Sequence, residues 1–181
     1  MADLIKEGKV RNIGVSEITA DQLRKANSIH TISALEIGYS LADRQIESEL
    51  LPAAKELGIA VVAFANTAEG LLTGDMKAPI AANDHRNHFS RFQRENLINN
   101  LKKVEVLTRL SRNKGYSPAQ VAIAWVKEQG DYIMPLVSMS RRTRLPENMA
   151  AMEIVFTPEE INTLNTTFAV GAILGGTYFQ R

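Results

Sequence analysis

Short apolar stretches alternate along this chain with longer stretches in which apolar residues recur every three or four positions. Four of the short stretches, residues 10–15, 34–39, 59–64 and 132–137, have the length and composition of β-strands. Residues 59–64 are apolar at consecutive positions, a pattern typical of a strand that is buried on both faces of a parallel sheet. The four stretches therefore predict a small parallel sheet.

Helices are predicted between and after these strands. The clearest helix starts are three capping-box pairs, in which each side chain bonds the other residue's backbone N–H: Thr19 with Gln22, Ser117 with Gln120, and Thr157 with Glu160. Helical periodicity predicts one helix beginning near residue 19 and others over about 46–57, 95–114, 117–129, 144–152 and 157–168. Gly58 follows the second helix and is placed to adopt the left-handed conformation that ends many helices.

The alternation of strand and helix defines the fold class. Repeated four times, it predicts parallel βαβ units and an α/β fold, with residues 1–181 forming a single domain. Residues 65–93 lack periodicity over a length that is uncommon for a loop, so we expect a functional, lid-like loop there. Residues 171–181 predict a flexible tail. Four strands cannot close a barrel alone, so the strand pattern does not specify the architecture of the sheet.

Charge and cysteine content narrow the classes of partner and the compartment. Lys and Arg number 21 against 20 Asp and Glu, a net charge of +1, so we expect no nucleic-acid or membrane partner. The absence of cysteine excludes a disulfide scaffold, a thiolate metal site and a cysteine nucleophile. The first residues are too charged for a signal peptide, and no run of about 18 apolar residues follows. We therefore expect a cytoplasmic protein.

Candidate chemistry lies where the predicted strands end, because ligands of parallel α/β folds bind beyond the carboxyl ends of the strands. Residues 138–144 combine three arginines with hydroxyls before a helix, which indicates either a phosphate site or a solvated basic turn. Glu36, in the second strand, either faces a ligand or is paired in the core. Phe64, at the end of the third strand, either stacks on a planar ring or is a core aromatic.

The histidines do not indicate a metal site. His85 and His88 have a spacing that would place two ligands on one helical turn, but no thiolate and no carboxylate pair is placed to complete the site, so we expect no metal. Asp84 beside His85 suggests a catalytic triad, yet no serine in a strand-to-helix elbow accompanies it, so a polar loop is the better interpretation. Neither of the common glycine-rich nucleotide-binding motifs is present.

Several segments resemble, in order, parts of the aldo-keto reductases. Residues 8–17 resemble the family's fifth strand, and residues 58–74, which end in Gly-Leu-Leu-Thr-Gly, resemble the seventh strand and its loop. Residues 91–97 and 117–126 resemble the helices between the seventh and eighth strands, and residues 144–148 resemble the motif after the eighth. The resemblance implies a parallel (β/α) half-barrel equivalent to strands five to eight of a TIM-type (β/α)8 barrel, which typically needs about 250 residues.

The resemblance also implies an activity, and it implies that the catalytic residues lie in a different part of the barrel from this chain. Aldo-keto reductases transfer a hydride between NADPH and a carbonyl or alcohol, and their catalytic Asp, Tyr, Lys and His follow the first four strands. NADPH is therefore the expected cofactor, and no catalytic residue is assigned in this chain. Tyr39 and Tyr178 do not match the position of the family's proton donor. A small carbonyl substrate is expected only if the barrel is completed.

Seven residues match positions that bind the cofactor in this family. At the nicotinamide end, Ser16 and Glu36 match contacts to the amide, and Phe64 matches the aromatic that stacks on the ring. Ser138 lies in the residue pair that follows the eighth strand. At the adenosine end, Arg144 matches the arginine near the 2′-phosphate, and Glu147 and Asn148 match adenine contacts. These seven are the candidate cofactor-binding residues.

Three substitutions depart from the family's pattern. Glu36 replaces a Gln, and an ionised Glu accepts hydrogen bonds but cannot donate them. The usual Tyr-Ser-Pro-Leu is replaced by Phe64-Ala65-Asn66-Thr67, which removes hydroxyls that would face the pyrophosphate. The usual Gly-Thr or Lys-Ser pair is replaced by Ser138-Met139. The adenosine end of the site is therefore better supported than the pyrophosphate end.

Two hypotheses follow for the whole chain. The first is an aldo-keto reductase-related oxidoreductase polypeptide that carries the NADPH-binding half of the barrel and lacks the catalytic half. The second is a non-catalytic half-barrel that assembles with itself, or with a complementary half, as a binding or structural module. Four parallel strands leave two open edges and an apolar inner face, which favours a homo-oligomer or a partner half.

Overall fold

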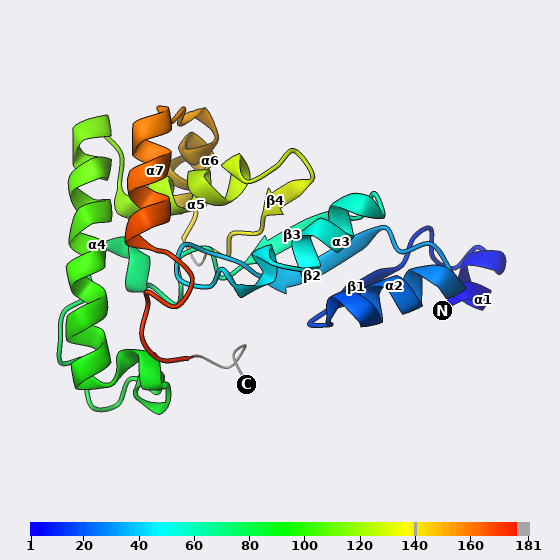
Figure 1. Ribbon diagram of the computed structural model, residues 1–181, viewed down its shortest axis with the longest axis horizontal. Helices are drawn as coiled ribbons and strands as arrows, with labels where there is room; N and C mark the ends of the chain where they lie inside the picture. Colours follow the sequence, from blue (N-terminus) through cyan, green and yellow to red (C-terminus); the bar gives the residue numbers. More distant parts are fainter. Residues whose placement is uncertain (140, 177–181) are drawn as a thin grey trace.

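The sheet consists of four short parallel strands that follow one another in chain order (Figure 1). The computed structural model describes residues 1–139 and 141–176. The strands are β1 (Gly14–Ser16), β2 (Ala34–Gly38), β3 (Ala60–Phe64) and β4 (Ile133–Pro135), and their order in the sheet is β1-β2-β3-β4. All four predicted strands are confirmed, each shorter than its apolar stretch.

Helices connect the strands and cover one face of the sheet. They are α1 (Ala2–Lys6), α2 (Ala20–Ile29), α3 (Leu50–Glu56), α4 (Arg94–Lys114), α5 (Pro118–Glu128), α6 (Arg144–Met149) and α7 (Pro158–Thr167), with short 3₁₀ turns η1 (Gln45–Glu47), η2 (Leu71–Thr73), η3 (His85–His88), η4 (Ser90–Phe92) and η5 (Ala150–Glu153). In Figure 1 the N-terminal elements lie at one end of the molecule and α4 and α7 at the other. The parallel α/β fold is therefore confirmed.

The helix boundaries follow the capping signals closely. All three capping boxes are present: the Thr19, Ser117 and Thr157 side chains each accept from the backbone N–H three residues on, and the return bond is made in each case. Gly58 has a φ of +67°, as expected where α3 ends. The helix α1 was not predicted, and none of its residues is buried.

The core lies between the sheet and the helices. Along β2 and β3 the buried positions alternate with more exposed ones: Leu35, Ile37, Val61 and Ala63 are buried. Trp125 of α5 is also buried, and its Nε1 donates to the Asn165 side chain at 3.1 Å. The opposite face of the sheet carries the more exposed members of each strand, so it is the open face. No helix in the described part of the chain combines the length and apolar character needed to cross a membrane.

The segments predicted as a lid-like loop and a flexible tail both make specific contacts. Residues 65–93 contain η2, η3 and η4, and Phe89 and Phe92 are buried. Of the tail 171–181, the first six residues are described. Gly176 N donates to Ser90 Oγ at 2.9 Å, and Leu174 N donates to Asn100 Oδ1 at 2.8 Å. Residues 177–181, and Tyr178 with them, lie outside the described part.

Candidate functional site

Two polar candidates lie side by side on the open face of the sheet. Ser16 ends β1, and in the parallel register it lies opposite Glu36 of β2. Glu36 is exposed between the buried Leu35 and Ile37, because successive side chains of a strand point to opposite faces. Of the two alternatives for Glu36, the structure therefore supports the open face and not a pair in the core.

Phe64 stands at the carboxyl end of the neighbouring strand. It is the last residue of β3, lies opposite Gly38 in the register, and is half-buried. Glycine at the opposing position leaves the space beside the ring without a side chain on that strand. Ser16, Glu36 and Phe64 together bring a hydroxyl, a carboxylate and an aromatic ring to three adjacent strands, with Ser16 and Phe64 at the strand ends and Glu36 in the middle of β2.

A cavity of 460 Å³ joins Phe64 to the region after β4. Ser138 and Asn148 line it together with Phe64, and its other polar lining comes from Asn66, Thr67 and Glu69. No lysine or arginine of the described residues lines this cavity. The structure thus brings three of the seven candidate residues into one cavity, whose walls offer hydroxyl, amide and carboxylate groups but no cation.

The loop after β3 is held in an unusual backbone conformation. Ala65, Ala68 and Glu69 have φ values of 56°, 49° and 50°, in the left-handed region that L-residues seldom adopt. Buried Asn66 fixes the start of the loop, because its Nδ2 donates to the carbonyls of Ala63 at 2.9 Å and Tyr39 at 3.2 Å. Backbone of this kind is concentrated at binding sites, where packing over-determines it. No pattern in the sequence predicted this conformation.

Glu69 is the titratable group most changed by its position in this loop. Its Oε2 is buried and has no hydrogen-bond partner among the described residues. Burial raises the pKa of the Glu69 carboxyl above its ordinary value, and the positive charge of Arg91 opposes that shift. Glu69 therefore places a carboxyl group with a raised pKa at the wall of the cavity.

Arg144 lies in a second cavity, of 520 Å³, and not in the one lined by Phe64. Its neighbours in the lining include Thr73, Lys77, Asp84 and Arg86. Arg144 itself is exposed and makes no ion pair among the described residues. The guanidinium is therefore available to a ligand. Ser140, which belongs to the predicted phosphate loop 138–144, lies outside the described residues.

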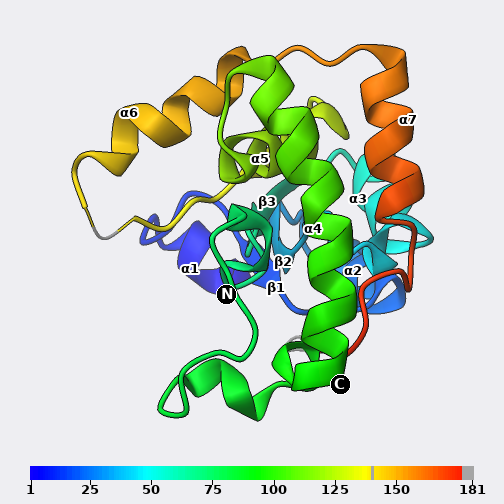
Figure 2. The ribbon, with the colours of Figure 1, turned by 90° about the vertical axis from the view of Figure 1, so that its left-hand side faces the viewer.

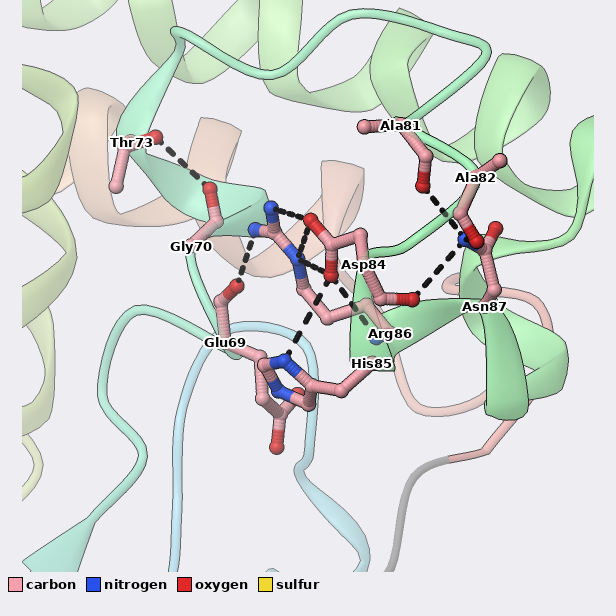
Figure 3. A network of polar contacts seen from close by, with 9 residues as sticks. All are labelled: Glu69, Gly70, Thr73, Ala81, Ala82, Asp84, His85, Arg86 and Asn87. Atoms are coloured by element: carbon pink, nitrogen blue, oxygen red, sulfur yellow. Dashed lines mark hydrogen bonds and ion pairs between the residues drawn. The ribbon is translucent and has the colours of Figure 1, made fainter.

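Asp84 and Arg86 form the polar centre of that second cavity (Figure 3). Arg86 Nε and Nη2 donate to the Asp84 carboxylate at 2.9 and 2.5 Å, and Arg86 Nη1 donates to the Glu69 carbonyl at 3.0 Å. The hydrogen bonds from Arg86 hold the pKa of Asp84 well below its usual range. The arrangement ties η3 back to the loop after β3, which explains the order of residues 65–93.

The short helix α6 divides the remaining candidates between the two cavities. Arg144, its first residue, lines the 520 Å³ cavity, and Asn148 lines the 460 Å³ cavity. Glu147 is exposed and lines neither of these two cavities, and its carbonyl accepts from Gln120 Nε2 at 2.7 Å. The seven candidate cofactor-binding residues therefore do not line one enclosed pocket. They are distributed from the open face of the sheet to α6.

Tyr39 and the Asp84–His85 pair are both engaged in contacts within the fold. Tyr39 is buried, donates to Glu47 Oε1 at 2.7 Å, and has a pKa raised well above its ordinary value by burial and by that bond. Residues 1–139 and 141–176 contain no cluster of three metal-ligating side chains. The carboxylate of Asp84 is engaged with Arg86, so the neighbouring His85 lies 3.7 Å from it without forming a triad.

A buried ion pair that was not predicted from the sequence joins two loops of the fold. Arg91 is buried, and its Nη1 donates to Asp43 Oδ2 at 2.8 Å. The pair joins η4 to the loop after β2, across 48 positions of sequence. Residues 91–97 resemble the family, and this resemblance includes Arg91 but does not identify Asp43 as its partner.

Comparisons with known proteins agree with this geometry. The profile of the Aldo/keto reductase family matches residues 1–167. A "Probable aldo-keto reductase 1" from Glycine max is 33% identical over 178 residues, which cover 98% of this chain and 51% of that protein. The chain thus spans about half the length of this relative.

Solved structures show the same fold. A glycerol dehydrogenase from Gluconobacter oxydans matches with a TM-score of 0.87 and 24% identity, over 97% of this chain and 54% of that one. A thermostable aldo-keto reductase solved with the inhibitor epalrestat matches with a TM-score of 0.71 and 22% identity, over 92% and 52%. With the family profile matching most of the sequence, this chain belongs to the aldo/keto reductase family.

Proposed function

We propose that this chain is the NADPH-binding half of an aldo-keto reductase barrel, with its four strands equivalent to strands five to eight. The observation that carries the proposal is that Ser16, Glu36 and Phe64 lie on three adjacent strands, on the open face, with Ser16 and Phe64 as the last residues of β1 and β3. The half-length match to the relatives supports the same assignment. The catalytic Asp, Tyr, Lys and His of the family would then lie outside these strands.

The residues present fit the two ends of the cofactor. Ser16 can donate and accept beside the accepting Glu36, which suits the amide of a nicotinamide, and the half-exposed ring of Phe64 suits stacking. Arg144, as an exposed cation, suits the 2′-phosphate of the adenosine, with Asn148 and Glu147 on the same short helix. When bound, the cofactor would supply the hydride.

The fit is weaker where the diphosphate of the cofactor would lie, between its nicotinamide and adenosine ends. The 460 Å³ cavity has Thr67 and Ser138 as its hydroxyl donors and no cation among the described residues, while Glu69 contributes a carboxyl group. A diphosphate near Glu69 would favour the neutral form of that carboxyl, which can donate a hydrogen bond. We therefore expect cofactor affinity to come chiefly from the nicotinamide and 2′-phosphate ends.

Binding can be separated from catalysis by calorimetric titration of the 181-residue chain with NADPH and with NADH. A guanidinium on the 2′-phosphate should favour NADPH about tenfold, and Arg144→Ala should remove most of that preference. Arg142→Ala, in the same basic segment, is the matched control and should keep it. Equal affinity for the two cofactors in the unsubstituted chain, or equal effects of both substitutions, would overturn this assignment of Arg144.

A small carbonyl substrate becomes a candidate only when a catalytic half completes the barrel. The chain alone should therefore oxidise no NADPH in the presence of aldehydes or ketones. Robust NADPH-dependent turnover by the pure chain would contradict the absence of the catalytic half. A cytoplasmic location also remains a prediction.

A non-catalytic, self-assembling half-barrel is the second candidate function. It is favoured by the apolar side chains that β4 and the residues after it expose: Met134, Leu136, Met139, Leu145 and Met149 are all more than one-third exposed. The strands β1 and β4 are also unpaired at the two edges of the sheet. A complementary half or a second copy of this chain would cover both features.

Light scattering coupled to size-exclusion chromatography tests the second candidate. Assembly with itself predicts a dimer, with slow amide exchange in both β1 and β4 because each edge would be paired. A monodisperse monomer would contradict self-assembly. It would leave the complementary half as the partner that the open face requires.

A further inference from the structure

A groove of 830 Å³ runs along the outside of the fold between α4 and the segment that follows η2. One wall is formed by Gly74, Met76, Lys77 and Ala78, and the other by one side of α4. In Figure 2 this segment, coloured between the cyan and the bright green of the bar, descends beside the lower half of α4, and Figure 1 also places the two together. The groove shares no residue with the 460 Å³ cavity.

The wall formed by α4 is a continuous stripe along the helix. Its members recur every three or four residues and therefore share one face: Ile98, Leu101, Lys102, Glu105, Thr108, Arg109 and Arg112. From Ile98 to Arg112 the stripe is about 21 Å long, at 1.5 Å per residue. Gly74 closes one end, since its backbone approaches Thr108 and Pro118 so closely that a Cβ would be crowded there. The stripe is thus as long as a helix of about four turns.

The floor of this groove is apolar and its rim is basic. Met76, Ala78 and Leu101 are partly buried against the core, and Ile98 is 44% exposed. Four cations and one carboxylate surround them: Lys77, Lys102, Arg109, Arg112 and Glu105. Within residues 1–139 and 141–176 none of the four cations makes an ion pair, although other cations of this chain do. The lining of the groove therefore carries more positive than negative charge.

The distribution of charge selects among classes of occupant. A ligand with one anionic head and one apolar tail would neutralise one cation and leave the others unmatched. A polyanion such as a nucleic acid would leave the apolar floor in contact with a charged backbone. A peptide helix with acidic residues on both sides of an apolar stripe satisfies the floor and both rims at once, because residues three and four apart share a face.

We propose that this groove binds an acidic, amphipathic helix of about 14 residues from a partner protein. Its apolar side chains would lie on Ile98, Leu101 and Met76, and its carboxylates would face the cations of α4 and Lys77. The proposal does not depend on cofactor binding, since Ser16, Glu36, Phe64 and the 460 Å³ cavity lie apart from the groove. Met76 and Lys77 also line the cavity of Arg144, so the test uses residues of α4 alone.

Fluorescence anisotropy with a synthetic peptide tests this surface. The probe is a labelled peptide of about 14 residues made of Glu and Leu, with Leu recurring every three or four positions. The full 181-residue chain should bind it, and the affinity should fall as salt is raised, because screening weakens the contacts of exposed charges. A peptide with Lys in place of every Glu should bind at least about tenfold more weakly.

Two charge-reversed variants separate the groove from the general charge of the chain. Lys102→Glu with Arg109→Glu reverses two groove cations, and we expect a loss of affinity of about tenfold or more. Lys25→Glu with Lys55→Glu changes the net charge equally on exposed positions of α2 and α3, and should leave affinity within about twofold. Thermal unfolding of both variants verifies that each remains folded.

Each alternative outcome overturns the proposal. Absence of binding by the unsubstituted chain at low salt would show that the groove does not take such a helix. Equal loss in the two double variants would show that only the overall charge attracts the peptide. Equal binding of the Glu and Lys peptides would remove the electrostatic basis of the site.

Discussion

Ser16 and Glu36 lie opposite each other in the register of two parallel strands, and both side chains are exposed on the open face of the sheet. The pairing places a group that donates and accepts beside a group that only accepts when ionised. An amide ligand presents a carbonyl that accepts and an NH₂ group that donates, so its carbonyl depends on Ser16 while its NH₂ can use either residue. The proposed contacts to the nicotinamide amide depend on this pair.

Glu36→Gln should strengthen NADPH binding. A glutamine keeps an acceptor and adds an N–H donor for the amide carbonyl, and a hydrogen bond of this kind contributes about 0.5–1.5 kcal/mol, or roughly a two- to tenfold gain in affinity. Calorimetric titration with NADPH measures the change. Glu128→Gln removes one carboxylate from the exposed end of α5 and should leave affinity unchanged. Weaker binding by Glu36→Gln would contradict the role given to this position.

The buried pair of Asp43 and Arg91 should dominate the stability of the site's supporting loops. Asp43→Asn leaves a guanidinium that is 1% exposed without its carboxylate, and breaking a buried pair in this way typically costs about 3–5 kcal/mol. Urea unfolding followed by circular dichroism reports the difference in the free energy of unfolding.

The exposed pair of Arg24 and Glu56 is the matched control for that experiment. Glu56→Gln removes the same kind of contact at the surface and should cost at most about 1 kcal/mol. Similar losses in Asp43→Asn and Glu56→Gln would mean that burial of the first pair adds nothing.

Gly175→Ala should detach the first part of the C-terminal tail. Both Gly175 and Gly171 have positive φ, at 78° and 80°, so alanine is strained at either position. At Gly175 a Cβ would also overlap the backbone of Ser90 and Arg91, whereas at Gly171 the space is open. Amide exchange at Gly176 should therefore accelerate in Gly175→Ala and change little in Gly171→Ala. Equal protection in the two variants would exclude this steric explanation.

Stability should fall with rising pH because of Glu69. Its folded-state pKa lies above the ordinary value of 4.5, so the folded state holds a proton that the unfolded state releases first. The free energy of unfolding should therefore decrease as pH rises from about 4.5 through the folded-state pKa, and remain lower above it. Glu69→Gln should remove this decrease in urea titrations between about pH 4 and pH 8, whereas Glu128→Gln should retain it. A decrease that persists in Glu69→Gln must come from another group.

Local sequence signals predicted the four strands and the starts of three helices, but not every element or boundary. The capping pairs at Thr19, Ser117 and Thr157 predicted helix starts because both bonds of each box join residues only three apart. The apolar run at 59–64 likewise predicted β3, but the expected burial on both faces is not observed, since Val61 and Ala63 are buried while the alternate residues on the open face are half-buried. Helix α1 carried no such signal and buries nothing.

Features that depend on distant residues could not be predicted in the same way. The partner of Arg91 is 48 positions away, and no periodicity connects the two. The left-handed conformations of Ala65 and Ala68 are imposed by packing against the propensity of alanine, so composition predicts the opposite. The division of Arg144 and Asn148 between two cavities depends on how α6 packs against α5 and η5, which spacing along the chain does not specify.

Native mass spectrometry of the 181-residue chain, with and without NADPH, tests the central claim most directly, because it reports cofactor binding and assembly from one sample. The account predicts an adduct of one NADPH per chain, retained by Arg142→Ala and diminished by Arg144→Ala. No adduct at millimolar NADPH would contradict the claim that this half of the barrel carries the cofactor-binding surface.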